Sequence, residues 1–296
     1  MNAPDDQDSL IVSKYLFVVG APKCGTTSLH HYLGQHNRIF VPKRKELHFF
    51  SQPEVAETYY KVDLVDSEKA YFECFSEAED NQILGDFSPS YLAHPNAATR
   101  ISEKFKNLFI VICLRDPVER AISHYLMDRR MGLIDVELID VLQAPKQFPQ
   151  FFREYVRMGM YADDLQKYAN IFSREEIRVV TFPAIVEKTQ WVVDELIDFI
   201  GLDPTANVDL EAKNTYRAPR SNLITSLGKN PVGNHIWKIA RKFMPPSFLN
   251  SLLYTERKPQ LDEERRWLTA HYQDDWNTTK RWLQENQDIV IGLYDE

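Results

Sequence analysis

The chain of 296 residues is poor in cysteine and has no long hydrophobic run. A helix that spans a bilayer needs about 20 consecutive apolar residues, and no stretch approaches that length. The amino terminus, MNAPDDQDSL, is polar and acidic, unlike the basic and then apolar start of a secretory signal. The three cysteines have an odd count and a spacing that fits no zinc site, so we expect reduced thiols and no metal. These absences predict a cytoplasmic protein.

Internal repeats and low-complexity tracts are also missing from the sequence. Apolar residues make up 44% of the chain and aromatic residues 12%, which is ordinary for a folded protein and argues against disorder. A chain of this length can bury one sizeable core. We therefore expect a flexible tail over residues 1–13 and a single domain over residues 14–296.

Acidic residues outnumber basic ones and give a net charge of −8, but the charge is uneven. The segment 213–258 carries nine Lys or Arg and a single acid. Such a basic stretch in an acidic protein indicates anion binding or steering of a charged substrate. We expect it to form a donor lid or an acceptor surface, and residues 229–254 are a candidate for peripheral contact with an anionic membrane. The acidic remainder argues against nucleic-acid binding.

A strand, a glycine-bounded turn and a helix start follow one another in FVVGAPKCGTTSLHHYL, residues 17–33. Such a turn points backbone N–H groups at one spot, and the helix dipole favours an anion such as phosphate there. Gly20 and Gly25 have the spacing of the nucleotide-triphosphate loop, but Thr26 occupies the position of its lysine and Lys23 lies inside the loop. The Lys-Ser/Thr pair that places Mg²⁺ is therefore missing, which favours a phosphate site that works without a metal.

Apolar runs separated by turn residues predict strands that alternate with helices. Extended segments are expected at residues 15–19, 38–41, 82–86, 108–114 and 177–182. Helices are expected at residues 26–34, 54–61, 68–75, 97–105, 118–130, 161–172, 189–200, 235–243 and 263–285. This alternation predicts an α/β, P-loop-like three-layer fold with a central parallel sheet flanked by helices.

Four segments stand in an order and spacing typical of one known family. They are PKCGTTSL in the loop, KELHFF at 45–50, GDFSPSYL at 85–92 and IVICLRDPVERAISHY at 110–125. With them the chain resembles the sulfotransferases that depend on 3′-phosphoadenosine 5′-phosphosulfate (PAPS), in a soluble, bacterial-type form similar to the heparan-sulfate-type carbohydrate enzymes. The resemblance implies transfer of a sulfuryl group from PAPS, leaving PAP, to a hydroxyl or amine of a carbohydrate, glycolipid or small molecule.

The resemblance also implies how the donor is held. Lys23 would neutralise the oxygen that leaves with the phosphate, while Arg115 and Ser123 would bind the 3′-phosphate. NTYRAPRS, at 214–221, is similar to a late family loop that closes over the donor. An ion pair of Arg115 with Asp116 or Glu119 is the alternative for that arginine. The expected donor-binding residues are Lys23, Cys24, Gly25, Thr26, Thr27, Ser28, Arg115, Ser123, Arg217 and Arg220.

KELHFF supplies the expected general base, Glu46, because its apolar neighbours would raise the carboxyl pKa toward useful basicity. The family resemblance implies the same residue. His48 is the competing base, since two residues further along an extended segment share a face. The position of Cys24 beside Lys23 would lower the pKa of its thiol, although filling the loop is its simpler role. Lys23, Glu46 and His48 are thus the catalytic candidates.

Two other functions stay open from the sequence. An ATP-dependent small-molecule kinase would need the Walker-type lysine that Thr26 replaces. An inactive nucleotide-binding module would not need both Lys23 and Glu46. Near Asp86 and Phe87, heparan-type relatives often carry a lysine that contacts the substrate, and its absence weakens the case for a glycosaminoglycan acceptor. The acceptor and the oligomeric state are not readable from the sequence.

Overall fold

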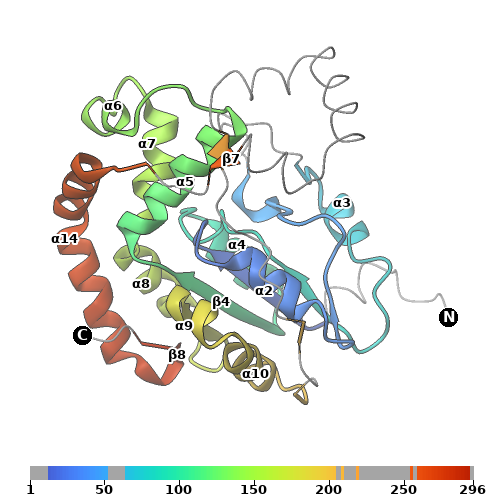
Figure 1. Cartoon of the computed structure of the whole chain (residues 1–296). Coiled ribbons are helices and arrows are strands. Elements are labelled where there is room, and N and C mark those ends of the chain that lie inside the picture. The colour runs from blue at the N-terminus through green and yellow to red at the C-terminus, as the bar shows by residue number, and fades with distance from the viewer. Residues whose placement is uncertain are drawn as a thin grey trace, which may run out of the picture.

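The fold is built on a parallel sheet of six strands in the order β2–β3–β1–β4–β5–β8 (Figure 1). The computed structural model describes residues 13–52, 64–204, 208–209, 218–219, 254–255 and 259–293. The sheet strands are β1 (Tyr15–Gly20), β2 (Ile39–Phe40), β3 (Ile83–Asp86), β4 (Leu108–Leu114), β5 (Ile177–Thr181) and β8 (Val290–Ile291). Two further strands, β6 (Ala218–Pro219) and β7 (Tyr254–Thr255), form a separate antiparallel pair.

The two central strands are the most apolar. Every residue of β1 is buried, and all but one residue of β4. Strands with helices on both sides bury both faces, which is why their sequences are nearly continuous apolar runs and not alternating ones.

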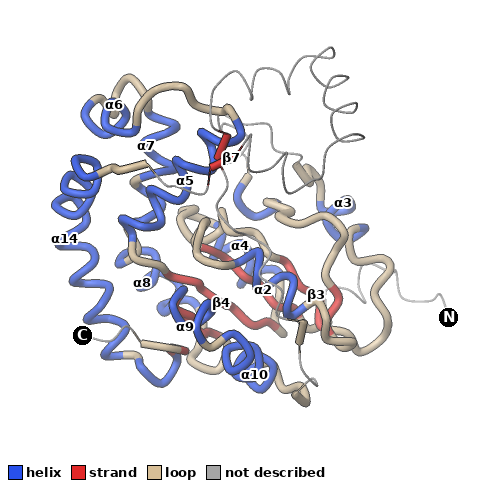
Figure 2. The backbone as a smooth tube through the Cα atoms, in the orientation of Figure 1, coloured by secondary structure: helices blue, strands red, loops and turns tan. Residues whose placement is uncertain are grey.

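Helices cover both faces of the sheet, as Figure 2 shows, and complete the predicted three layers. On one face α2 packs beside α10, and on the other α4 packs beside α8. The C-terminal helix α14 runs along the outside of α5 and α8. The helices are α2 (Thr26–Leu33), α3 (Glu68–Glu73), α4 (Ala97–Lys104), α5 (Pro117–Met131), α6 (Leu138–Gln143), α7 (Pro149–Tyr155), α8 (Ala162–Ile171), α9 (Phe182–Glu187), α10 (Thr189–Phe199) and α14 (Asp262–Glu285).

A second apolar cluster lies beside the main core, among α5, α6, α7 and α14. Tyr125, Leu138, Tyr155 and Leu268 are buried in it. The carboxylate of Asp275 on α14 accepts hydrogen bonds from the backbone N–H groups of Tyr161 and Ala162 at the start of α8. The last helix therefore helps to hold the elements that flank the central strands.

Predicted and observed bounds differ by one or two residues at most elements. Three helices of six or seven residues, α6, α7 and α9, and the two-residue strand β8 were not predicted, because such short elements show no clear hydrophobic period. The helices expected at 54–61 and 235–243 lie outside the described residues, as do residues 1–12 of the expected tail.

The strand order reverses at the middle of the sheet. The chain goes from β1 out to β2 at one edge, and from β4 to β5 on the opposite side. In open α/β sheets this reversal opens a crevice at the carboxyl ends of the two diverging strands, and ligands bind there. Gly20 ends β1 and Leu114 ends β4, so the segments just after them border the expected site.

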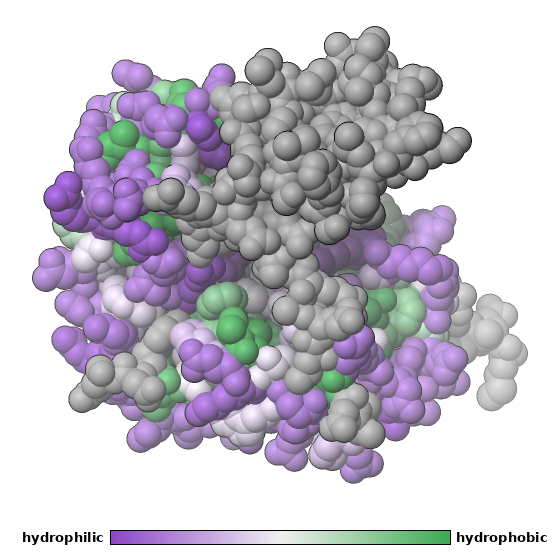
Figure 3. All heavy atoms as spheres, in the orientation of Figure 1, coloured by the Kyte–Doolittle hydropathy of each residue, from purple (hydrophilic) through white to green (hydrophobic). Residues whose placement is uncertain are grey.

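On the face drawn in Figure 3, hydrophilic side chains cover most of the described surface and hydrophobic ones form small, separate patches. Among the described residues, the large apolar side chains with the highest exposure are Met131, Val186, Trp191 and Leu293. The described part of this face therefore presents scattered apolar residues in place of one broad apolar patch.

Candidate active site

The loop between β1 and α2 is shaped by left-handed backbone conformations. Lys23 has φ 70° and Gly25 has φ 93°. A Cβ atom on Gly25 would stand 3.0 Å from Cδ1 of Ile185 and 3.3 Å from Cδ2 of Phe182, so a side chain does not fit there without displacing both neighbours. Gly25 also caps the start of α2. The loop thus brings backbone close to the amino end of a helix, the arrangement that binds phosphate.

Lys23 is a partly buried cation beside α5. Its Nζ donates to Sδ of Met127 across 3.1 Å. Burial, and then repulsion by Arg130, lowers the pKa of Lys23 to about 8, against the opposite effects of Asp128 and Glu46. An anion bound in the loop would restore the stability of the ammonium form.

Arg115 follows β4 and reaches across to the loop after β1. Its Nη1 donates to the carbonyl oxygen of Lys23 at 3.3 Å, and its guanidinium stacks over the ring of Phe182 at 4.5 Å. Its Nη2 also lies 3.9 Å from a carboxylate oxygen of Glu119, so the ion pair considered from the sequence is present as a long contact. Asp116 instead caps α5 by accepting the N–H of Glu119.

The hydroxyl residues of the loop differ in exposure. Thr26 is buried, Ser28 is partly buried and Thr27 is exposed, all in the first turn of α2. Ser123 is partly buried on α5, about two turns beyond Arg115. The structure therefore brings the loop and Arg115 together. Arg217 and Arg220 lie outside the described residues.

Cys24 corrects an expectation. Its thiol is fully buried and lies 3.8 Å from the hydroxyl of Tyr161. Burial raises the thiol pKa to about 11, in spite of the nearby charge of Arg120, whereas the sequence suggested a lowered value. The side chain fills the space behind the loop, and only the backbone of Cys24 remains available to an anion.

The side chains of Glu46 and His48 lie close together, but the segment that carries them is not extended as the sequence predicted. Both residues adopt left-handed conformations, with φ 64° and φ 57°, in a turn before the short 3₁₀ helix Phe49–Ser51, so the segment is not extended. Nε2 of His48 lies 3.6 Å from Oε2 of Glu46, and Lys45 makes a close ion pair with the other carboxylate oxygen. The turn therefore gathers a carboxylate, an imidazole and an ammonium group.

The pKa of Glu46 is shifted in the direction opposite to the one expected. Burial by itself would raise this pKa, but the hydrogen bond from His48 and the charge of Lys45 outweigh burial and lower it to about 2. The apolar neighbours in KELHFF were the visible signal. The contact with Lys45 depends on the turn, which the sequence did not show.

His48 belongs to a hydrogen-bond network of largely buried polar groups. Its backbone N–H donates to Oγ of Ser88 at 3.1 Å, and that hydroxyl donates to Oδ1 of Asp86 at 2.6 Å. Nδ1 of the imidazole lies 2.7 Å from Oγ of Ser90, which lies 2.7 Å from Oγ of Ser51. Burial raises the pKa of Asp86 to about 6, against three hydroxyl hydrogen bonds that lower it. Sequence reasoning missed these serines, although the SPS of GDFSPSYL was visible.

Burial lowers the pKa of two other imidazoles near the site, those of His30 and His124. Burial lowers the pKa of His30 to about 4, and its ring stands edge-on to Phe87. Burial and the charge of Arg120 hold the pKa of His124 well below its usual range. Phe87 itself is a buried core residue.

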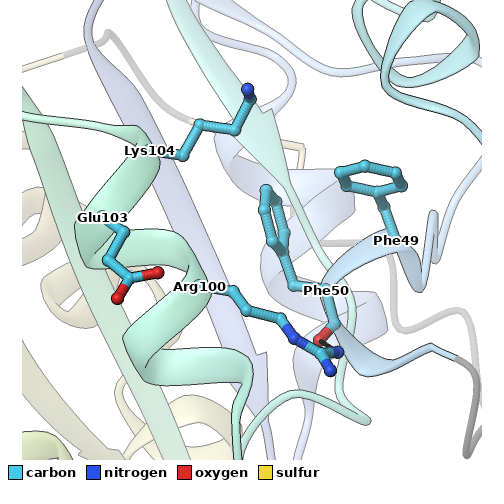
Figure 4. Close-up of a pocket in the computed structure, with 5 residues that line it drawn as sticks. All are labelled: Phe49, Phe50, Arg100, Glu103 and Lys104. Atoms are coloured by element: carbon cyan, nitrogen blue, oxygen red, sulfur yellow. Dashed lines mark hydrogen bonds between the residues drawn. The ribbon is translucent and has the colours of Figure 1, made fainter.

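A hollow of about 450 Å³ lies apart from these groups, between α4 and the segment after His48 (Figure 4). Its cations already have partners: Arg100 donates to the carbonyl oxygen of Phe50 at 3.1 Å, and Lys104 pairs with Glu68 at 2.7 Å. None of the catalytic candidates is in its wall, so we assign it no part in donor binding. The lining residues are Phe49, Phe50, Arg100, Glu103 and Lys104.

Within the part of the chain that the structure describes, no cluster of three or more His, Cys, Asp or Glu is placed to hold a metal ion. Among the same residues, no helix combines the length and the apolar character needed to cross a bilayer.

A P-loop-like α/β sheet whose β1–α2 loop lies at the switch point, beside an arginine that follows the adjacent strand β4, is an arrangement typical of proteins that bind nucleotides or phosphates. A family model for the sulfotransferase domain matches residues 13–246, and the chain belongs to this family. A crystal structure of a sulfotransferase from Alicyclobacillus acidocaldarius superposes with a TM-score of 0.63 at 27% identity, covering 77% of this chain and 95% of that one.

The curated relatives are longer proteins, and this chain matches only part of each. The membrane-associated sulfotransferase kil1 of Dictyostelium discoideum is 31% identical over 119 residues, 40% of this chain and 24% of the relative. Heparan sulfate glucosamine 3-O-sulfotransferase 3B1 of Homo sapiens is 25% identical over 187 residues, 62% of this chain and 45% of the relative. The chain thus spans less than half the length of these two relatives.

Proposed function

We propose that the protein transfers a sulfuryl group from PAPS to a hydroxyl or amine of a carbohydrate, glycolipid or small-molecule acceptor. The observation that carries this proposal is the hydrogen bond from Arg115 to the Lys23 carbonyl at the switch point. It places the arginine predicted to bind the 3′-phosphate next to the loop predicted to bind the 5′-phosphate. Membership of the sulfotransferase family supports the reaction class. In the reaction a bond forms between the acceptor atom and sulfur, the bond from sulfur to the phosphate oxygen breaks, and PAP departs.

On the donor side, the chain supplies fixed positive groups. The backbone from Cys24 to Ser28, with the Thr26 and Ser28 side chains, is proposed to hold the 5′-phosphate at the start of α2. Arg115 and Ser123 are proposed to hold the 3′-phosphate. Lys23 neutralises the charge that develops on the leaving oxygen, a role that its partly buried position makes effective.

Closure of the donor site by Arg217 and Arg220 stays a prediction, as does the role of the basic segment 213–258 as a lid. No metal is needed in this scheme, since Lys23 and Arg115 bear the positive charge that Mg²⁺ supplies in triphosphate enzymes.

On the acceptor side, Glu46 is proposed to remove the acceptor's proton, with His48 as the partner or the competing base. Their side chains already meet, so a proton taken by one can be shared with the other. The ion pair with Lys45 keeps Glu46 a weak base in the resting protein. For Glu46 to act, Lys45 must withdraw toward a new anion, and the sulfuryl oxygens of the donor would offer one.

The acceptor class is proposed from the relatives. Two of them are named for heparan sulfate glucosamine and for carbohydrate. We also propose one domain over 14–296 and a cytoplasmic location, in keeping with the free thiols of all three cysteines. Membrane contact through 229–254 stays a prediction, and residues 229–253 lie outside the described part of the chain.

The deciding experiment offers the purified chain both donors. Transfer of labelled sulfate from PAPS to a panel of sugars, glycolipids, phenols and alcohols is expected, with no transfer of labelled phosphate from ATP to the same panel. Phosphate transfer would establish the kinase instead. Tight PAP binding without any transfer to the panel would favour the inactive binding module.

A further inference from the structure

We propose that Phe182 is a positioning residue for the 3′-phosphate site: its ring supports the face of the Arg115 guanidinium and leaves the N–H groups at the guanidinium edge to the phosphate. The inference rests on the proposed function, because it takes Arg115 as the group that binds the 3′-phosphate. It gives Phe182 a part in the preference for PAP over AMP, which lacks that phosphate.

The sheet itself places Arg115 and Phe182 side by side. Strands β4 and β5 are parallel neighbours, and Leu114 at the end of β4 is in register with Thr181 at the end of β5. Arg115 and Phe182 are the next residues of the two segments, and neighbouring strands lie about 4.7–4.9 Å apart. The two residues therefore leave the sheet together at its carboxyl edge.

The ring of Phe182 borders two parts of the expected PAPS site. The guanidinium carbon of Arg115 lies 4.5 Å from the ring centroid, within the range of a cation–π contact. A Cβ atom on Gly25 would lie 3.3 Å from Cδ2 of the same ring, so the ring also lies against the loop after β1. Phe182 thus holds the arginine in a fixed place relative to that loop.

Stacking suits an arginine that must still bind a ligand. A guanidinium carries all its N–H groups in its plane, and a ring against its face uses none of them. Nη1 of Arg115 donates to the carbonyl oxygen of Lys23, and within the described part of the chain this is the only hydrogen bond of the guanidinium. Its other N–H groups are left for the oxygens of a phosphate.

The carboxylate of Glu119 does not replace the ring as the support of this arginine. Its Oε2 lies 3.9 Å from Nη2 of Arg115, which is beyond hydrogen-bond distance. Its other oxygen makes a close ion pair with Arg265 on α14. A tighter pair of Arg115 with Glu119 would occupy the N–H groups that a phosphate needs, whereas the contact with the ring keeps them available.

The test compares the binding of PAP and AMP. Phe182→Leu keeps carbon atoms at the δ positions, where the ring borders Gly25, and removes the aromatic face. We expect this variant to bind PAP about 3- to 30-fold more weakly, the range of a partly desolvated cation–π contact, and AMP within about twofold of wild type. Isothermal titration calorimetry measures both affinities, and circular dichroism checks that the variant is folded.

Matched variants separate positioning from packing. Phe182→Tyr keeps an aromatic face and should keep the wild-type preference for PAP. Phe199→Leu removes a ring that stacks in the same way, at 4.3 Å, on Arg178 near the amino end of β5, and should leave both affinities unchanged. Phe182→Met is a second variant without an aromatic face, and it should give the result expected for Phe182→Leu if the leucine variant does not fold.

A double variant tests whether Phe182 acts through Arg115. If it does, adding Phe182→Leu to Arg115→Ala should weaken PAP binding no further, because the group that the ring supports is already absent. An additional loss as large as that of Phe182→Leu in the wild-type background would show that the ring acts independently of the arginine. That result would overturn the positioning role.

The outcomes distinguish this inference from the proposed function. A Phe182→Leu variant with the full wild-type preference for PAP would overturn the inference and leave sulfuryl transfer untouched. Equal binding of PAP and AMP by the wild-type chain would refute the 3′-phosphate site, and the role of Phe182 with it. A preference for PAP that Phe182→Leu weakens, in a chain that transfers no sulfate, would refute the proposed function and confirm the role of Phe182.

Discussion

Nη1 of Arg115 donates a hydrogen bond to the main-chain carbonyl oxygen of Lys23 across 3.3 Å, although 92 positions separate the two residues. The bond ties the segment after β4 to the loop after β1. Stacking of the same guanidinium on Phe182, at the start of α9, adds a third element. A ligand that displaces or shares this arginine therefore acts on the conformation of the loop, so we expect donor binding and loop geometry to be coupled.

The first prediction concerns the 3′-phosphate. Arg115→Ala should remove a charge-assisted hydrogen bond of about 1.5–3 kcal/mol and weaken the binding of PAP roughly tenfold or more. The affinity for AMP, which lacks the 3′-phosphate, should change far less. Isothermal titration calorimetry with both nucleotides measures the two affinities.

Arg174→Ala is the matched control, because Arg174 is an exposed arginine that pairs with Asp288. It should leave both affinities at their wild-type values. Equal binding of AMP and PAP by the wild-type protein would contradict the assignment of Arg115 to the 3′-phosphate.

The second prediction uses the pKa of Lys23, which burial lowers to about 8 in the free protein. A bound phosphate stabilises the ammonium and raises that pKa, so binding above pH 8 must take up a proton. The affinity for PAP should therefore hold below pH 8 and fall by up to about tenfold per pH unit above it. Calorimetry at pH 7, 8 and 9 tests this slope.

Lys23→Arg supplies the comparison, since a guanidinium stays charged throughout this range. Its affinity should be nearly independent of pH. A wild-type affinity that does not change between pH 7 and pH 9 would show that the lysine charge does not contribute to binding.

The third prediction is that turnover needs no divalent metal. The loop has Thr26 where triphosphate enzymes have the lysine before their Mg²⁺-binding hydroxyl. Adding EDTA should leave the rate of sulfuryl transfer within about twofold of the untreated enzyme, a change far smaller than the several kcal/mol that a catalytic metal supplies. Loss of activity with EDTA and its return with Mg²⁺ would favour the kinase alternative.

The sequence predicted what depends on local pattern and missed what depends on distant contacts. The apolar runs of β1 and β4 and the glycines of the loop were visible, because burial on both faces and a left-handed turn restrict residue type. The pKa shifts of Cys24 and Glu46 were predicted with the wrong sign. The pKa of Cys24 is raised because the fold buries the thiol, and the pKa of Glu46 is lowered because a turn brings His48 and Lys45 to the carboxylate.

The sequence correctly predicted that Glu46 and His48 lie close together, but it predicted an extended segment where the structure has a turn. An extended segment would place Glu46 and His48 on one face, and the structure instead brings them together through two left-handed residues. No residue-type rule signals such a turn, since neither position is a glycine. Its support comes from Ser88 and Asp86, which lie about 40 positions further along the chain.

The fourth prediction separates the two candidate bases. Glu46→Gln keeps the shape of the side chain but cannot take a proton, so kcat should fall by about 10²–10⁴ while the Kd of PAP stays close to wild type. Glu77→Gln, which changes an exposed glutamate paired with Lys43, should leave kcat unaltered. His48→Ala should lower kcat less than Glu46→Gln does if Glu46 is the base. Steady-state kinetics with PAPS and a responsive acceptor measure all three variants. An inactive His48→Ala beside a Glu46→Gln variant of near-normal kcat would make His48 the base and reduce Glu46 to the carboxylate that stabilises its imidazolium.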